Sequence, residues 1–169
     1  MNKNDYNHIV QTISHRVYAF MLKSCGNEEL AKDITQDAFL KLWENHDKVD
    51  PEKARSWLFT TAHRLFLNSI KKNQHHTNYT NENHVQFEHQ NFENKDLINQ
   101  CFKELSDQQK QIVLLRDLEG YNYDEIGEIL QLSASQVKVY LFRARKKFKE
   151  AMMKLESDAS PQHLIQKAI

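Results

Sequence analysis

The residues best suited to chemistry in this chain are the cations that gather between positions 129 and 149. This stretch holds six lysines and arginines and no aspartate or glutamate. Apolar residues recur within it at helical spacing, at Val137, Leu141, Ala144 and Phe148. One face of such a helix can pack on a neighbour while the opposite face meets phosphates and base edges. The pattern therefore predicts a helix that enters a groove of DNA.

Capping signals place this helix in a helix-turn-helix. A capping box pairs Ser, Thr or a similar residue with Glu or Gln three positions later, and Gly120 stands where a left-handed helix end is expected. We predict a compact helical module from about Phe102 to Met153, with a helix that ends near Leu118 before the helix-turn-helix begins. An ordinary helical bundle with a solvated basic face is the alternative. The predicted boxes are Ser106 with Gln109, Asn122 with Glu125, and Ser133 with Gln136.

The first half of the chain reads as three helices, over residues 6–22, 28–43 and 54–72. Gly26 and Asn27 separate the first two, and Pro51 suits the first turn before the third. Glycine and proline are scarce, with three and two copies, which disfavours an all-β architecture. The sequence therefore predicts an all-α protein.

The third of these helices also carries a surface suited to nucleic acid. Residues 53–81 contain no acid. Single-stranded bases are held by cations that follow the backbone and by aromatic faces or pockets. Trp57 and Phe59 could stack on bases, and the loop from His46 to Lys53 could form a base pocket. For Trp57 a core position is favoured, because its spacing with later apolar positions is helical.

Charge is balanced overall but segregated along the chain. There are 23 basic and 23 acidic residues, and the acids concentrate in residues 28–52. This pattern suggests two basic surfaces for one partner and an acidic surface for another.

Cys25 and Cys101 form no disulfide framework, and no apolar run reaches bilayer length. We expect a soluble, cytoplasmic, reduced protein with no membrane segment.

Residues 73–94 have a linker composition, rich in Asn, Gln, His and Glu. We expect proteolysis to cut there and to release two helical fragments. Histidines 75, 76, 84 and 89 fit no closed zinc pattern, so no metal and no cofactor are expected. The chain also lacks a phosphate loop, a nucleophile elbow and a metalloprotease motif, so no enzymatic activity is expected.

Three stretches resemble bacterial RNA polymerase sigma factors of the compact extracytoplasmic-function (ECF) group. Residues 31–43 look like the helix that binds core polymerase, residues 55–72 like the −10 promoter helix, and residues 105–145 like the −35 helix-turn-helix. The resemblance implies two small helical domains joined by a polar linker. It implies an alternative sigma factor with three partners: core RNA polymerase, promoter DNA in double- and single-stranded form, and an anti-sigma factor. The implied boundaries are 5–73 for domain 2, 74–95 for the linker, 96–154 for domain 4 and 155–169 for a tail.

The resemblance also assigns roles to individual residues. Polymerase binding falls on the exposed positions of the second helix, −10 binding on the third helix, and −35 binding on the recognition helix. The polymerase-binding set is Asp33, Gln36, Asp37 and Lys41; the −10 set is Arg55, Trp57, Phe59, Arg64, Asn68, Lys71 and Lys72; the −35 set is Ser135, Gln136, Lys138, Val139, Phe142, Arg143, Arg145 and Lys147.

The chain departs from the usual family pattern at several of these positions. His63-Arg64 replaces the common Arg-Asn, Asn68 replaces Asp, and Lys71-Lys72 replaces an arginine pair. Lysine lacks the bidentate fork of arginine, which puts base-specific contacts at that pair in doubt. Gln136 and Val139 replace Thr and Ser, which predicts an altered −35 preference.

Two other functions compete with the sigma-factor interpretation. A stand-alone helix-turn-helix regulator would need a sensing first half, but that half has no phosphoacceptor pattern and no ligand-pocket signature. An enzyme that acts on DNA, such as a recombinase, would need a nucleophile beside an arginine cluster, and none is evident. Binding to core RNA polymerase separates the first hypothesis from both alternatives.

Overall fold

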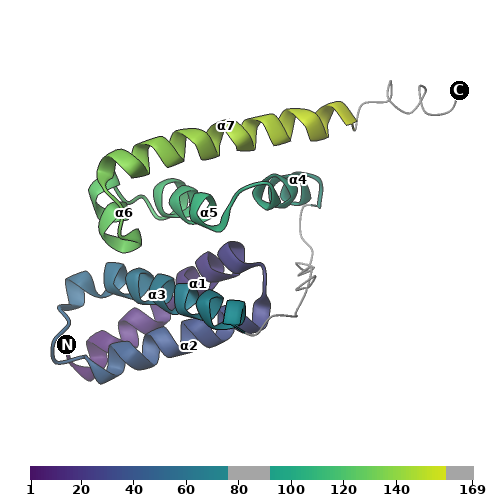
Figure 1. Cartoon of the computed structure of the whole chain (residues 1–169). Helices are drawn as coiled ribbons and strands as arrows, with labels where there is room; N and C mark the ends of the chain where they lie inside the picture. Colours follow the sequence, from purple (N-terminus) through teal and green to yellow (C-terminus); the bar gives the residue numbers. More distant parts are fainter. Residues whose placement is uncertain (76–91, 159–169) are drawn as a thin grey trace, which may run out of the picture.

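The computed structural model describes residues 1–75 and 92–158, and every regular element within these ranges is helical. The elements form two layers (Figure 1): α1 to α3 make one domain, and α4 to α7 lie above it. The all-α, two-domain prediction is thus confirmed. In chain order the elements are α1 (Lys3–Cys25), α2 (Glu28–Glu44), the 3-10 turn η1 (Pro51–Lys53), α3 (Ala54–His75), α4 (Phe92–Lys103), α5 (Asp107–Val113), the π-helical segment η2 (Leu114–Leu118), α6 (Tyr123–Leu130) and α7 (Ala134–Asp158).

The helices of the first domain begin and end at local signals. Asn2 forms a capping box with Asp5 at the start of α1, and Gly26 ends that helix in the left-handed region, at φ 65°. Asn27 then caps α2 by accepting a hydrogen bond from the Leu30 backbone. The observed helices run slightly beyond the predicted ranges, because capping residues outside the apolar repeat set their ends.

The predicted capping boxes of the second domain are all present. Asn122 and Glu125 bond reciprocally, as do Ser106 and Gln109, and Ser133 and Gln136 do the same at the start of α7. The helix predicted to end near Leu118 keeps α geometry only to Val113 and continues as the π-helical η2. Gly120 then adopts the expected positive φ, 76°.

The turn of the helix-turn-helix is held by a close backbone approach at Gly127. The Leu132 N–H donates to the Gly127 carbonyl at 2.9 Å, and Gln131 adopts φ 58° to allow the reversal. A Cβ at position 127 would lie 2.5 Å from the Leu132 carbonyl oxygen. Since real Cβ atoms do not approach backbone oxygen so closely, glycine is required there by packing and not by its own φ.

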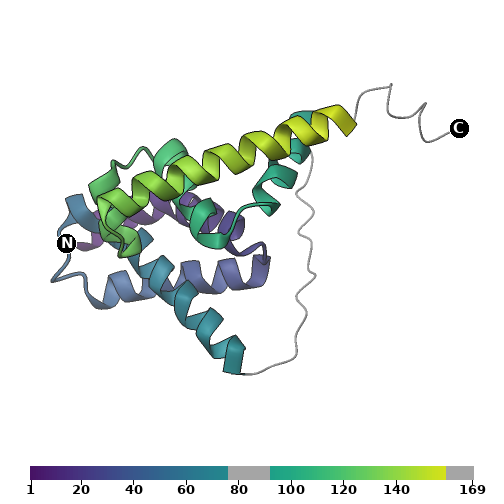
Figure 2. The ribbon, with the colours of Figure 1, turned by 45° about the horizontal axis from the view of Figure 1, so that its top comes forward.

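The two domains are in contact, although their linker composition suggested independence. α1 packs against α5, and α3 packs against α6; a rotated view shows the same apposition (Figure 2). Buried residues of both domains belong to one continuous apolar cluster. The ordered helices also reach into the predicted linker, since α3 extends to His75 and α4 begins at Phe92. Histidines 76, 84 and 89 lie outside the described residues.

Candidate nucleic-acid interface

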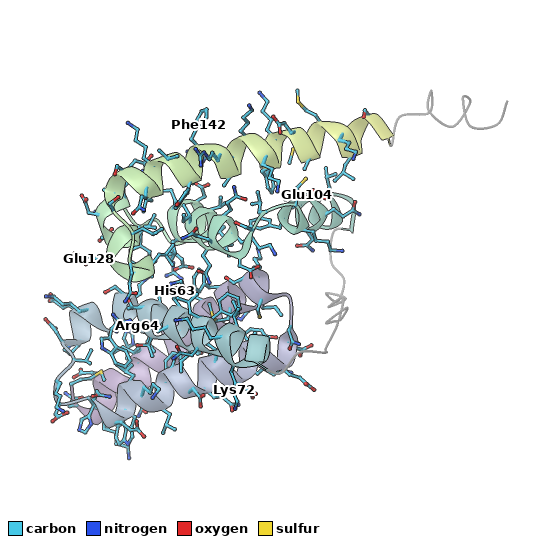
Figure 3. All side chains as sticks on the ribbon, in the orientation of Figure 1. His63, Arg64, Lys72, Glu104, Glu128 and Phe142 are labelled. Atoms are coloured by element: carbon cyan, nitrogen blue, oxygen red, sulfur yellow. The ribbon has the colours of Figure 1, made fainter. Side chains whose placement is uncertain are left out.

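The outer face of α7 presents the whole predicted −35 set to solvent. The opposite face of α7 is buried through Val137, Leu141 and Ala144. Two members of the predicted set are apolar, Phe142 with 70% of its surface exposed and Val139 with 45%. Figure 3 shows Phe142 projecting from α7 away from the first domain. The exposed set is Ser135, Gln136, Lys138, Val139, Phe142, Arg143, Arg145 and Lys147.

Three members of this set are already engaged within the domain. The Ser135 hydroxyl lies within hydrogen-bond distance of the Ser133 hydroxyl, at 3.0 Å. The Gln136 side-chain oxygen accepts from the Ser133 backbone N–H at 2.8 Å and from its hydroxyl at 3.0 Å. Only the amide NH₂ of Gln136 is therefore left to donate to a base or phosphate. Arg145 forms an ion pair with Asp117 of η2. A phosphate contact by Arg145 would compete with this carboxylate.

The predicted −10 residues divide between two faces of α3. Arg64, Asn68, Lys71 and Lys72 are exposed. Arg55 lies nine residues before Arg64, which is about two and a half helical turns and therefore the opposite side. That opposite side faces the second domain, so four of the seven predicted −10 residues are open to solvent, whereas Arg55 and Phe59 lie on the covered side.

Arg55 is held by two residues of the second domain. Its Nη2 donates to the Glu119 backbone oxygen at 2.6 Å and to Glu119 Oε2 at 2.9 Å. The guanidinium also lies over the Tyr121 ring, 4.7 Å from the ring centroid. Arg16 of α1 reaches the same Glu119 Oε2 at 2.8 Å. Arg16 and Glu119 were not predicted as site residues, because nothing local to either residue marks a contact between domains.

Phe59 is fully buried, contrary to the prediction that its ring could stack on bases. It packs edge-on against Phe20 of its own domain at 5.2 Å and against Tyr121 of the other domain at 5.8 Å. In the docked arrangement this ring is unavailable to DNA. Trp57 is half-buried and packs against the core, in line with the core position favoured for it.

His63 lies one helical turn after Phe59, on the face of α3 that the second domain covers. Its Nδ1–H donates a hydrogen bond to the side-chain oxygen of Gln111 on α5, at 2.9 Å. Figure 3 places His63 between the two layers. Burial lowers the pKa of His63 below its ordinary value, the Gln111 hydrogen bond opposes this shift, and the charge of Arg64 adds to it. The neutral imidazole is therefore the form that suits the docked state.

The predicted polymerase-binding face of α2 is fully open to solvent. Asp33, Gln36, Asp37 and Lys41 are all exposed. Leu40 lies among them with 55% of its surface exposed. An apolar side chain in the middle of a polar helix face is typical of the centre of a protein interface. Leu40 stands four residues after Gln36 and therefore on the same helix face. This spacing could have identified it from the sequence, but the prediction did not include it.

The loop between α2 and α3 carries a small aromatic stack. His46 lies parallel to Trp43 with centroids 5.1 Å apart, and Tyr6 meets Trp43 edge-on at 5.0 Å. The N-terminal ammonium donates to the His46 carbonyl at 2.9 Å. These contacts fix the start of the loop in which a base pocket was predicted.

Residues 1–75 and 92–158 contain neither a metal-binding cluster nor a membrane-spanning helix. Within those ranges no group of three or more His, Cys, Asp or Glu side chains is arranged to hold a metal ion. No helix in the described part of the chain has the length and apolar character needed to cross a bilayer.

Fold and site together define a two-domain helical protein that binds DNA through a helix-turn-helix. Comparison with known families agrees: residues 9–76 match Sigma-70 region 2, and residues 95–148 match Sigma-70, region 4. The chain is 30% identical over 152 residues to the RNA polymerase sigma factor YlaC of Bacillus subtilis (strain 168), covering 80% of this chain and 84% of YlaC. It is 28% identical over 148 residues to the ECF RNA polymerase sigma factor SigM of the same organism, covering 83% of this chain and 91% of SigM.

Solved structures show the same fold at low sequence identity. The sigma factor RpoE in complex with the anti-sigma factor NepR, from Bartonella quintana, matches with a TM-score of 0.77 at 18% identity, covering 89% of this chain and 98% of RpoE. CnrH in complex with the cytosolic domain of CnrY matches with a TM-score of 0.63 at 18% identity, covering 94% of this chain and 92% of the matched chain. The chain belongs to the ECF group of the sigma-70 family, and its function is that of an alternative sigma factor in transcription initiation.

Proposed function

We propose that this sigma factor divides its task among three surfaces, one for core RNA polymerase and two for promoter DNA. The observation that carries the proposal is the placement of the predicted residues on separate exposed helix faces, on α2, on the open side of α3 and on α7. We assign residues 5–73 to domain 2, 74–95 to the linker, 96–154 to domain 4 and 155–169 to a tail.

The α2 face is the surface proposed for core polymerase. Acidic Asp33 and Asp37 flank the exposed Leu40, with Gln36 and Lys41 beside them. This combination of an apolar centre and a charged rim is suited to a protein partner and unsuited to DNA, whose phosphates would be repelled by the carboxylates.

The α7 face is the surface proposed for the −35 element. Lys138 and Arg143 supply donors for guanine, and Val139 and Phe142 supply apolar contacts for thymine methyl groups. Lys147, one turn beyond Arg143, is suited to a phosphate. The exposed cations of α3 serve the −10 element in the same way, through Arg64, Lys71 and Lys72.

We further infer that an anti-sigma factor restrains the protein. We also infer that the sigma factor acts in the cytoplasm, where core RNA polymerase is found. The anti-sigma inference is supported by the similar structure of RpoE from Bartonella quintana, in which a sigma factor is bound to an anti-sigma factor. The protein directs an enzyme to promoters and needs no catalytic group of its own. The stand-alone regulator remains the competing function, since it would also use α7 on DNA.

A pulldown with core polymerase, followed by run-off transcription, tests the proposal. The Asp33→Lys/Asp37→Lys variant should lose core binding while it keeps its fold, because changes at exposed sites cost little stability. Asp47→Lys/Glu52→Lys is the matched control, with the same charge change at exposed residues off the α2 face. Equal core binding by both variants would show that the α2 face is not the interface. A wild-type chain that binds promoter DNA but never core polymerase would favour the stand-alone regulator.

A further inference from the structure

Arg16 and Arg55 converge on one oxygen although they come from different helices. Their guanidinium groups lie 2.8 Å and 2.9 Å from Oε2 of Glu119, which follows η2 in the other domain. The Glu119 side chain is only 9% exposed, whereas those of Arg16 and Arg55 are 40% and 34% exposed. The two arginines thus form a cationic pair on the first domain, and the second domain places a carboxylate against it.

Two arginines that converge on one anionic oxygen are suited to binding a phosphate group. Arginine presents its donors in a planar fork that matches phosphate oxygens, and paired arginines are a common means of binding that group. The carboxylate does not use all the donors, because Arg55 Nε is buried and has no hydrogen-bond partner among the described residues. A phosphate group offers more acceptor oxygens than the single carboxylate oxygen that the pair now shares.

The Arg16–Arg55 pair lies beside the helix that we assign to promoter DNA. Arg55 opens α3, the helix whose exposed cations we assign to the −10 element. Arg55, Phe59 and His63 are spaced four residues apart and therefore share one face. The second domain covers this face through Glu119, Tyr121 and Gln111, respectively.

We propose that Arg16 and Arg55 form a phosphate-binding site for promoter DNA, and that Glu119 of the same chain occupies it when the two domains dock. Domain docking and DNA binding by this face of α3 then exclude each other. The inference rests on the proposed function, since it takes promoter DNA as the competing ligand. It adds Arg16 to the DNA-binding residues and makes Glu119 an internal mimic of a DNA phosphate.

The docked interface has the character of a contact that can open. Three buried side-chain atoms in the described ranges lack a hydrogen-bond partner, and all three belong to residues at this interface: Arg55 Nε, Gln111 Nε2 and the Tyr121 hydroxyl. Each such atom gives up its hydration without replacement on docking. Undocking that returns water to these atoms offsets part of the stability that a DNA strand must overcome, and it removes the contact of Phe59 with Tyr121.

The experiment uses the full chain and a fluorescein-labelled single-stranded DNA of mixed sequence, about 20 nucleotides long, a length that exceeds a typical single-strand site. Fluorescence anisotropy measures affinity over a range of salt concentrations, and small-angle X-ray scattering measures the radius of gyration. Glu119→Gln should enlarge the free protein and bind the DNA several-fold more tightly than wild type. Glu128→Gln is the matched control, since Glu128 is an exposed carboxylate on α6 of the same domain (Figure 3).

A second variant tests the phosphate site itself. Arg16→Gln, introduced into the Glu119→Gln protein, should weaken DNA binding and reduce the slope of log K against log salt by about 0.7, the value for one phosphate of a single strand. Arg16→Lys in the same background should retain most of the slope. If Glu119→Gln does not fold, as judged by circular dichroism, the wild-type chain decides: neutron scattering with the DNA contrast-matched must show that saturating DNA enlarges the radius of gyration of the protein component.

Three results would overturn the inference. The first is a Glu119→Gln protein that is as compact as Glu128→Gln and has the same DNA affinity. The second is an unchanged salt slope on the Arg16 substitution. The third is DNA binding to the wild-type chain with no expansion of the protein. Core-polymerase pulldown on the same samples separates this failure from failure of the proposed function. A chain that binds core but shows no effect of Glu119 refutes the phosphate mimic alone, and a chain that never binds core refutes the sigma-factor assignment of surfaces.

Discussion

The Tyr121 hydroxyl provides a test of the domain interface in which a deletion should stabilise the protein. The ring is well placed, with Arg55 over its face at 4.7 Å and Phe59 at its edge at 5.8 Å. The hydroxyl is buried without a hydrogen-bond partner among the described residues, and burial raises the pKa of Tyr121 to about 12. Tyr121→Phe removes this oxygen and keeps the ring.

The expected gain follows from the desolvation of that oxygen. A buried polar group with no partner costs about 1–3 kcal/mol, and phenylalanine retains most of the interaction between ring and cation. We expect Tyr121→Phe to raise the free energy of unfolding by about 1 kcal/mol, at the lower end of that range because the site relaxes. For a chain of this size the Tm should rise by about 2–4 °C. The substitution should also stabilise the docked arrangement of the two domains, so single-stranded DNA should bind the free chain more weakly.

Thermal unfolding followed by circular dichroism at neutral pH measures the effect. Tyr140→Phe is the matched control, because Tyr140 is a partly buried tyrosine on α7 away from this interface; it should change stability by less than about 0.5 kcal/mol. Tyr121→Leu should lower the Tm, since it loses the ring contacts together with the hydroxyl. A Tyr121→Phe protein less stable than the control would show that the hydroxyl has a favourable partner and that our account of the interface is wrong.

Three further predictions concern the turn, the acid response and the recognition helix. Gly127→Ala should destabilise the second domain by about 1–3 kcal/mol, because the new Cβ meets the Leu132 carbonyl oxygen; an unchanged melting curve would contradict the close approach. The buried, neutral His63 has a lowered pKa, so docking is fully stable above the ordinary histidine pKa of about 6.5 and weakens as pH falls below it. Scattering measured across this range should show acid expansion that His63→Gln lacks. Arg143→Ala should relax discrimination at one base position by about 1–3 kcal/mol, while Lys147→Ala should weaken all sequences alike and lower the salt slope by roughly one unit. Uniform losses for Arg143→Ala over all single-base variants of a promoter would exclude base reading.

Helix limits and the exposed recognition surface could be predicted from the sequence because their causes are local. A capping box joins residues three positions apart, and the two members at Asn122 and Glu125 can be read directly from the chain. Helical periodicity likewise separates Val137 and Leu141, which are buried, from Phe142, which is exposed. These features depend on nearest-turn geometry and on the burial of one stripe, whatever the partner of that stripe is.

The covered face of α3 could not be predicted in this way. Periodicity shows that Phe59 shares a stripe with Arg55, but it does not show which element covers the stripe. That outcome depends on Glu119, 64 residues further along the chain, and on a π-helical segment that ends just before it. The same holds for His63 and Gln111, which are 48 residues apart.

The amino-acid sequence by itself therefore determined the order of the helices, most of their caps and the exposed recognition face of α7, since each follows from interactions within one or two turns. The tertiary structure alone decided that the two domains dock and that Phe59 is buried. It also decided that Arg55 is paired with a carboxylate before any DNA is present. Docking balances the burial of apolar area against the desolvation of polar groups on two separate domains, and this balance depends on how distant side chains meet in space.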